Sequence, residues 1–201
     1  MELRPWTLPN LLTLARLGAL PFIILAILDG RQDTAVVIFL AAAVTDLLDG
    51  FVARRFGMTS PLGAYLDPIT DKLFLISTYV ACALPSTPGL VHIPLWLVIL
   101  TISRDVLILL VALLMYLVLD VRSFPPSPLG KATTFVEISL VVAVLLVNLG
   151  LLPRAFTDVG VTVVAFFTVS SGLHYTWRVA NLASPRSPRP APPGAPPADA
   201  A

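Results

Sequence analysis

Long apolar runs alternate along this chain with short polar or turn-forming breaks. A helix needs about 20 mostly apolar residues to cross roughly 30 Å of hydrocarbon, and six segments meet that requirement: 8–28, 34–56, 62–84, 91–119, 129–149 and 156–179. Helices are expected because hydrocarbon offers no hydrogen-bond partner to an exposed backbone. The pattern therefore predicts an all-α integral membrane bundle of six transmembrane helices within residues 1–183.

Composition argues against a water-soluble fold. Of the 201 residues, 57% are hydrophobic and 12% are charged, and the mean hydropathy is +0.89. A soluble globular domain carries about a quarter charged residues, so this chain would expose too much apolar surface in water. The formal net charge of +1 also argues against a nucleic-acid partner, because nucleic-acid-binding proteins present a broad basic surface.

The basic residues predict an orientation. Cytoplasmic loops of membrane proteins carry an excess of Lys and Arg, and if both termini lie in the cytoplasm, that side receives Arg4, Arg54, Arg55, Arg122, Lys131, Arg178, Arg186 and Arg189. Of the loop positions, only Arg31 and Arg154 then fall on the other side. The Pro- and Ala-rich stretch 184–201 lacks apolar periodicity and is expected to be a disordered cytoplasmic tail.

Four aspartates lie near the predicted cytoplasmic ends of the second and third segments. An ionisable side chain at the bilayer centre costs roughly 2.5–3.5 kcal/mol on insertion scales, so their presence calls for a reason. Asp46 and Asp49 share one helix face, and Asp67 and Asp71 share another, because residues three or four apart are neighbours on a helix. A short turn makes the two helices antiparallel, so both pairs can converge on one cavity. A single aspartate could simply meet lipid headgroups, but the spaced set argues for a common site.

Four converging carboxylates would repel one another unless cations neutralise them. Two divalent ions balance the charge, and oxygen ligands suit hard cations such as Mg²⁺ or Mn²⁺. Paired metals are a recurring device for phosphoryl chemistry. The small residues Gly50, Ala53 and Gly63 leave room for a ligand, and Arg54 offers a fork of donors suited to phosphate.

The same residues form a known pattern. The string Asp46-x2-Asp49-Gly50-x2-Ala53-Arg54-x8-Gly63-x3-Asp67-x3-Asp71 resembles the complete signature of the CDP-alcohol phosphotransferases, also called CDP-alcohol phosphatidyltransferases. The resemblance covers most of residues 5–180. It implies six membrane helices, an active site facing the cytoplasm, a multi-pass location in a bacterial inner membrane, and assembly as a homodimer.

The resemblance also implies roles for individual residues. Asp46, Asp49, Asp67 and Asp71 would bind two divalent metal ions, and Asp71 would also accept the proton of the acceptor hydroxyl. The CDP moiety would be bound by Gly50, Ala53, Arg54 and Gly63. The implied reaction transfers a phosphatidyl group from CDP-diacylglycerol to an alcohol and releases CMP, as a step of phospholipid biosynthesis.

The prediction of the acceptor alcohol depends on two basic residues. Arg104 lies well inside the fourth segment, where it either pairs with Asp105 or binds an anionic acceptor. Lys131 opens the fifth segment, where it either snorkels to the interface or joins the same anion site. An anionic acceptor favours glycerol 3-phosphate or phosphatidylglycerol over a neutral alcohol. We expect a phosphatidylglycerophosphate synthase, with a CMP-forming cardiolipin synthase as the alternative; the string Ser103-Arg104-Asp105 resembles the latter more.

Other interpretations remain open for a few polar residues. One face of the first segment carries Asn10, Thr13 and Arg16, which either border the nucleotide site or lie at the membrane interface. His174, near the end of the sixth segment, is expected to be interfacial or packed. A channel or transporter could bind cations with intramembrane aspartates, but it would need polar residues in both halves of several helices. An intramembrane prenyltransferase also uses aspartate-rich motifs with Mg²⁺, but normally places them on distant helices.

Overall fold

The computed structural model describes residues 8–56, 61–85, 87–119 and 127–183, with side chains described for 11–46, 67–85, 87–117 and 127–177. It contains no strand in these residues and six helices. They are α1 (Leu8–Leu28), α2 (Gln32–Phe56), α3 (Pro61–Ala83), α4 (Leu95–Leu119), α5 (Pro128–Asn148) and α6 (Ala155–Ala183). The all-α prediction is confirmed, and the predicted tail 184–201 lies outside the described residues.

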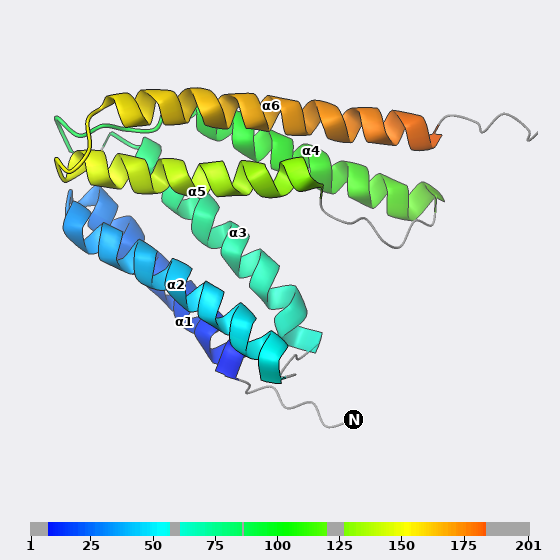
Figure 1. Cartoon of the computed structure of the whole chain (residues 1–201), viewed down its shortest axis with the longest axis horizontal. Helices are drawn as coiled ribbons and strands as arrows, with labels where there is room; N and C mark the ends of the chain where they lie inside the picture. The colour runs from blue at the N-terminus through cyan, green and yellow to red at the C-terminus, as the bar shows by residue number, and fades with distance from the viewer. Residues whose placement is uncertain (1–7, 57–60, 86, 120–126, 184–201) are drawn as a thin grey trace, which may run out of the picture.

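The helices alternate in direction, so the chain has two distinct ends. One end, here the aspartate end, holds the start of α1, the end of α2 and the start of α3; the opposite end holds the turns 29–31, 84–94 and 149–154. In Figure 1 the ribbons of α1–α3 and α4–α6 lie close together at the opposite end and diverge toward the aspartate end. The N-terminal side of α1 and the end of α6 both lie toward the aspartate end.

Two of the tight turns follow from the same local chemistry. Gly30 and Gly150 follow α1 and α5 with φ of 73° and 74°, a conformation that costs glycine little. After α1 the N–H of Gly30 donates to Ile27 and that of Arg31 donates to Ala26. This pair of bonds satisfies carbonyls that a helix end leaves without partners. Glycine therefore sets where the helix stops and lets the next one return beside it.

Two helix boundaries differ from the prediction by four residues: α6 ends at Ala183 where 179 was predicted, and α4 begins later than predicted. The fourth apolar segment was expected to be helical from Val91, but α4 begins at Leu95. The Pro94 carbonyl accepts the N–H groups of Leu97 and Val98, and residues before a proline disfavour helical geometry. The apolar residues 91–93 instead form a connection, in which the Ile93 N–H donates to the Cys82 carbonyl. Hydrophobicity alone could not separate a buried connection from the first turn of a helix.

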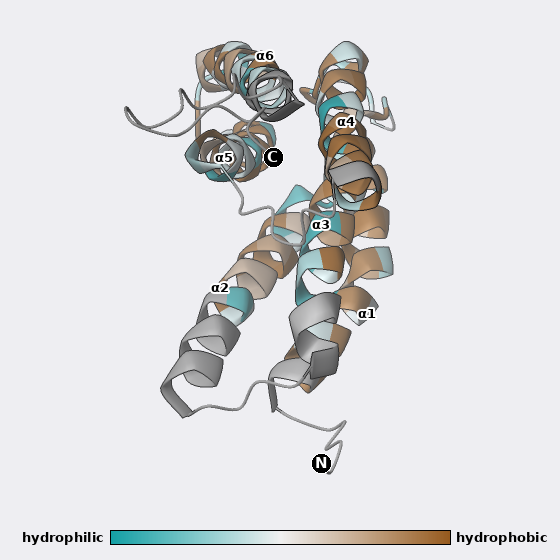
Figure 2. Ribbon diagram, turned by 90° about the vertical axis from the view of Figure 1, so that its right-hand side faces the viewer, coloured by the Kyte–Doolittle hydropathy of each residue, from teal (hydrophilic) through white to brown (hydrophobic). Residues whose placement is uncertain are grey.

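The helices pack in two groups that α3 joins. α1 contacts α2 and α3, α6 contacts α4 and α5, and the groups meet where α3 contacts α4 and α5 and where α2 contacts α5. The core includes Ile23, Ala26, Leu97 and Val141, all fully or almost fully buried. Figure 2 shows that hydrophobic residues make up much of the described helices, and many large apolar side chains are exposed on the outside of the bundle. Among these outward residues are Phe22, Val37, Leu109, Phe166 and Leu173.

The outward apolar surface identifies a multi-pass membrane protein. Within the described residues, four stretches have the length and composition to cross a bilayer: Leu11–Leu28, Leu95–Leu117, Pro128–Asn148 and Ala155–Trp177. The other two helices, α2 and α3, carry the aspartates of the signature. A soluble protein of this size would not leave so many large apolar side chains uncovered.

Candidate active site

The aspartates reach the site from two antiparallel helices. Asp46 projects from α2, and Asp67 and Asp71 from successive turns of α3. The backbone of Asp49 lies one turn beyond Asp46 on α2. The Asp49 side chain is not among those that the structure describes. The same limit applies to the positions expected to bind CDP, which are Gly50, Ala53, Arg54 and Gly63. Three of the four predicted metal ligands can therefore be described.

The first helix supplies the partners of these three carboxylates. The Arg16 guanidinium donates from Nη2 to Asp46 Oδ1 at 2.9 Å and from Nη1 to Asp71 Oδ1. One turn earlier on the same helix, the Thr13 hydroxyl donates to Asp67 Oδ1. Both α1 side chains are almost fully buried. Thr13 and Arg16 therefore face the aspartates and the inside of the bundle; the side chain of Asn10 is not among those described, and a nucleotide site beside this face stays a prediction.

The charge balance around Arg16 explains why an arginine can be buried here. Removing a guanidinium from water is costly unless opposite charge and hydrogen bonds replace the hydration. The Arg16 side chain is 4% exposed, whereas those of Asp46 and Asp71 are 48% and 43% exposed. The two carboxylates therefore stabilise the buried cation and still present part of their surface outward. They hold α1, α2 and α3 together at the depth of the site.

The donor chemistry fits a pair of divalent cations. The converging groups are carboxylate oxygens, the ligands that Mg²⁺ and Mn²⁺ prefer, and a cationic guanidinium already lies between two of them. Within the described residues, no three His, Cys, Asp or Glu side chains are grouped closely enough to hold a metal. Asp49 is the expected fourth ligand and lies outside those side chains. The described residues thus gather negative charge and cation-binding atoms, while the ligand set itself stays a prediction.

A second polar cluster lies beside the first, on the other face of α3. Lys72 directly follows Asp71, and its Nζ lies 2.6 Å from Asp105 Oδ2 on α4. The same Nζ lies 3.9 Å from Glu137 Oε2 on α5. Glu137 is almost fully buried. This cluster joins α3 to the helices that carry the predicted acceptor residues.

Arg104 belongs to this cluster and makes the structural pair that was one of the two roles considered for it, while its role in acceptor binding stays a prediction. Its Nη1 donates to Asp105 Oδ1 at 2.8 Å, which is the pairing that the sequence left open. Its Nη2 donates to the Ser171 hydroxyl of α6, and its buried Nε has no hydrogen-bond partner among the described residues. The guanidinium also faces the start of α5, where a Cβ on Gly130 would lie 3.3 Å from Nη2.

The start of α5 is built to approach that guanidinium. Ser127 caps the helix by accepting the N–H of Gly130 at 3.0 Å, and the Ser127 N–H donates to the Tyr175 hydroxyl at 3.1 Å. Backbone N–H groups at a helix start carry partial positive charge and favour anions. Lys131, the next residue, is exposed. The structure therefore places both predicted acceptor residues near one helix start, although only Arg104 is buried.

A hollow of about 240 Å³, counting the space at its mouth, lies behind this cluster. Asp105 and Glu137 line it together with Tyr79 and Thr101. The Tyr79 hydroxyl and Glu137 Oε1 are buried and have no hydrogen-bond partner in the described residues. Buried polar atoms are normally satisfied by protein or water, so this hollow has the lining to hold water between α3, α4 and α5.

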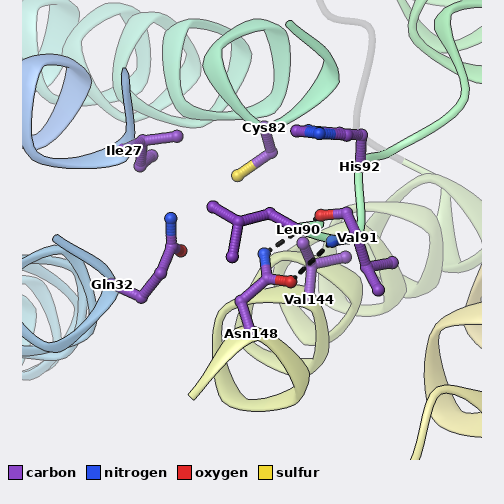
Figure 3. A pocket seen from close by; sticks show the side chains of 8 residues that line it. All are labelled: Ile27, Gln32, Cys82, Leu90, Val91, His92, Val144 and Asn148. Atoms are coloured by element: carbon purple, nitrogen blue, oxygen red, sulfur yellow. Dashed lines mark hydrogen bonds between the residues drawn. The ribbon is translucent and has the colours of Figure 1, made fainter. Parts of the chain in front are cut away.

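The opposite end has a different kind of polar contact. Asn148, the last residue of α5, accepts the Val91 N–H at 2.7 Å and donates to the Val91 carbonyl at 3.0 Å. Figure 3 shows this pair beside Gln32, Cys82 and His92. The side chain amide thus satisfies both backbone groups of a residue that belongs to no helix. This neutral pair joins α5 to the connection before α4, and exposed charged contacts lie around it: Arg154 Nη2 donates to the Gly89 carbonyl at 3.4 Å, and Arg31 lies 3.6 Å from Asp29.

Sequence reasoning missed several of these residues. Lys72 and Glu137 lie inside apolar segments, and their charge at that depth could have singled them out. The spacing of Thr13 and Arg16 did predict a shared face, but not which helices it meets. The role of Asn148 had no signal in the sequence, because a single amide at a helix end is common. His174, expected to be interfacial or packed, lies with its ring centroid 6.2 Å from that of exposed Trp177.

Comparison with known proteins agrees with the geometry. The model of the CDP-alcohol phosphatidyltransferase family matches residues 6–170. The CDP-diacylglycerol–glycerol-3-phosphate 3-phosphatidyltransferase of Bacillus subtilis is 34% identical over 187 residues, which cover 85% of this chain and 93% of that protein. The CMP-forming cardiolipin synthase of Streptomyces coelicolor is 35% identical over 141 residues, 66% of this chain and 61% of that protein.

The rat CMP-forming cardiolipin synthase is 40% identical over 106 residues, which cover 52% of this chain and only 33% of that protein. The family match spans the four aspartates, both α1 residues that contact them and the start of α5. Relatives of two different names thus resemble this chain, and the family model covers the part of the chain that forms the site. The chain belongs to the CDP-alcohol phosphatidyltransferase family and is a transferase of phospholipid biosynthesis.

Proposed function

We propose that the chain transfers the phosphatidyl group of CDP-diacylglycerol to the hydroxyl of glycerol 3-phosphate and releases CMP, as a phosphatidylglycerophosphate synthase. The observation that carries this proposal is the convergence of Asp46, Asp67 and Asp71 from two helices on one face of α1. Family membership supplies the CDP-linked donor. The relative that covers most of this chain is named for glycerol 3-phosphate.

In the proposed reaction the acceptor oxygen forms a bond to the phosphatidyl phosphorus as the bond from that phosphorus to CMP breaks. Asp71 receives the proton of the attacking hydroxyl, and CMP leaves with the electron pair of the broken bond. Asp46, Asp49, Asp67 and Asp71 would hold two Mg²⁺ or Mn²⁺ ions, which when bound neutralise the pyrophosphate and stabilise the leaving group. Gly50, Ala53, Arg54 and Gly63 would bind the CDP moiety.

The acceptor assignment is supported by Arg104. Its guanidinium faces the start of α5, whose first residues include Lys131, so both basic residues lie near one helix start. A phosphate binds well to a guanidinium, which presents donors in a planar fork. Asp105 accepts from Nη1 and Ser171 accepts from Nη2, and the buried Nε has no hydrogen-bond partner among the described residues. Glycerol 3-phosphate provides both the phosphate for this site and a hydroxyl for Asp71.

A second candidate acceptor is phosphatidylglycerol, which would make the chain a CMP-forming cardiolipin synthase. Relatives with that name are 40% and 35% identical to this chain over the parts that match, and a phosphodiester could meet the same basic groups. An acceptor panel separates the two: purified protein in detergent is given CDP-diacylglycerol, Mn²⁺ and either acceptor, and CMP release is measured. Release with glycerol 3-phosphate supports the first assignment. Release with phosphatidylglycerol alone replaces it with the second, and release with neither contradicts both.

We further propose that all six helices cross the membrane and that both termini are cytoplasmic. α2 and α3 have 25 and 23 residues, enough to span a bilayer. Arg31 and Arg154 are exposed at the opposite end, and the larger number of Lys and Arg in the loops and termini of the aspartate side favours the cytoplasm for that side. Cysteines placed at these two positions should react with an impermeant thiol reagent from outside an intact bacterial cell. The homodimer implied by the family resemblance is testable by crosslinking in membranes.

A further inference from the structure

We propose that Arg16 and Thr13 are positioning residues of the metal site: α1 fixes the aspartates of α2 and α3 from behind. This inference rests on the proposed function, because it assigns a role toward the metals that the aspartates would bind. The motif of eight signature positions contains no residue of α1. The contacts of the structure nevertheless place this helix directly against the site.

The geometry of the contacts carries the argument. One guanidinium donates through separate nitrogens to Asp46 on α2 and Asp71 on α3. A planar fork of this kind fixes both the distance and the angle between two carboxylates. Lysine has a single nitrogen and would hold the two oxygens less firmly. Arg16 therefore sets how two helices present their ligands to each other.

The oxygen atoms used are the second part of the argument. The described contacts of Asp46, Asp67 and Asp71 with α1 are all made through Oδ1. The Asp46 and Asp71 side chains remain nearly half exposed, so their surface is divided between a buried side on α1 and an open side. Carboxylates that bind metals are commonly oriented by hydrogen bonds on the side away from the metal. The buried α1 residues supply that support.

Thr13 extends the same arrangement to Asp67. Its hydroxyl is buried and lies one turn before Arg16, so the two donors follow one face of the helix. α1 thereby contacts three aspartates with two side chains. Loss of either donor should let a carboxylate rotate, which would weaken cation binding without removing a ligand. Mutating such outer partners typically lowers metal affinity by about 10- to 100-fold.

The test measures binding of Mn²⁺ alone to the full-length protein in detergent, followed by the electron paramagnetic resonance signal of free Mn²⁺. Arg16→Gln should weaken Mn²⁺ binding by about 10- to 100-fold, and Arg16→Lys should restore part of it. Thr13→Val should give a smaller loss. Unchanged Mn²⁺ affinity in both Arg16→Gln and Thr13→Val would overturn the proposal.

Matched controls separate positioning from general stability. Arg31→Gln removes an exposed arginine at the opposite end. Thr78→Val removes a buried hydroxyl that donates only to its own helix, at the Phe74 carbonyl. Neither should change Mn²⁺ affinity, and a loss in Thr78→Val equal to that in Thr13→Val would contradict the proposal. If Arg16→Gln does not fold, the Mn²⁺ affinities of Arg16→Lys and Thr13→Val still test the proposal, and wild-type affinity in both would overturn it.

A further variant distinguishes this inference from the proposed function. Asp46→Asn should abolish the high-affinity Mn²⁺ binding that the Arg16 variants weaken. If the wild type binds Mn²⁺ at the aspartates but releases no CMP, the proposed reaction fails and the positioning role stands. If the wild type releases CMP and the Arg16 variants bind Mn²⁺ normally, the reaction stands and the positioning role fails.

Discussion

The two ends of this bundle are held together by different polar groups. At the aspartate end, Arg16 and Lys72 pair with carboxylates that reach them from neighbouring helices. At the opposite end, Asn148 uses a neutral amide to satisfy both backbone groups of Val91. The half-exposed carboxylates Asp46 and Asp71 can exchange partners with a substrate, whereas both polar groups of the part-buried Asn148 amide are already bonded to Val91. The comparison separates residues that serve chemistry from residues that serve only the fold.

The largest effect should follow from a change at the aspartate end. Asp71→Asn keeps the shape of the side chain but cannot accept a proton, so CMP release should fall by at least about 100- to 10,000-fold. Binding of CDP-diacylglycerol should partly survive, because three other aspartates remain. The matched control is Asp158→Asn, which changes an exposed carboxylate in the first turn of α6 at the opposite end. Equal losses of CMP release in the two variants would show that a carboxylate at the aspartate end matters no more for turnover than one at the opposite end.

A smaller effect is expected at the start of α5. Arg104→Gln should raise the KM for glycerol 3-phosphate by about 10- to 100-fold, since hydrogen bonds to charged groups contribute roughly 1.5–3 kcal/mol. The KM for CDP-diacylglycerol should change little. Ser171→Ala serves as the control, because it removes one contact of the guanidinium and keeps its charge. A fall in thermal stability with both KM values unchanged would assign Arg104 to its structural pair with Asp105.

At the opposite end, stability and activity should separate. Asn148→Leu removes both hydrogen bonds to Val91 and leaves an N–H and a C=O without partners, which costs about 1–3 kcal/mol for each buried group. Thermal unfolding in detergent should show a lower Tm, while kcat at a temperature well below Tm stays the same. Asn148→Asp, which keeps the acceptor and loses the donor, should lie between. A large loss of kcat in the folded variant would show that this end takes part in turnover.

The smallest effect concerns helix packing between the two ends. A Cβ on Gly160 of α6 would lie 2.8 Å from Leu140 Cδ1 on α5. Gly160→Ala should therefore destabilise the protein by about 1 kcal/mol, at the low end for overpacked cores, because the clashing atom ends a side chain that can move. The double variant Gly160→Ala, Leu140→Val removes that atom and should recover part of the Tm. If the Tm of the double variant stays as low as that of Gly160→Ala, the contact with Leu140 Cδ1 is not the cause of the lost stability.

The sequence predicted the helices well because their boundaries have local causes. α1 ends where an apolar run meets Asp29 and Gly30, and this stop can be recognised without any tertiary contact. The start of α4 was wrong because the prediction followed hydrophobicity past Pro94, before which helical geometry is disfavoured. The connection that replaces the first turn is also held by Asn148, which lies 57 positions from Val91 in the chain. A contact over that distance leaves no trace in local hydrophobicity.

The residues of the candidate site also fall into those that the sequence predicted and those that it could not assign. The aspartates were found because a fixed spacing on two helices and an improbable depth in the membrane are visible in the sequence. Arg16 could not be assigned in this way, since its role depends on how α1 is rotated against α2 and α3. Arg104 shows a third case: the sequence left two roles open, and the geometry assigns one nitrogen to Asp105 while the face toward α5 supports the other.

The most direct test of the central claim is the metal dependence of CMP release. Purified protein is stripped of metal with a chelator, given CDP-diacylglycerol and glycerol 3-phosphate, and titrated with Mn²⁺ or Mg²⁺ beside the Asp46→Asn variant. We expect no CMP without added metal, saturable release as metal is added, and a large loss in the variant. CMP release that is unaffected by the chelator, or equal in the Asp46→Asn variant, would contradict a metal site at these aspartates.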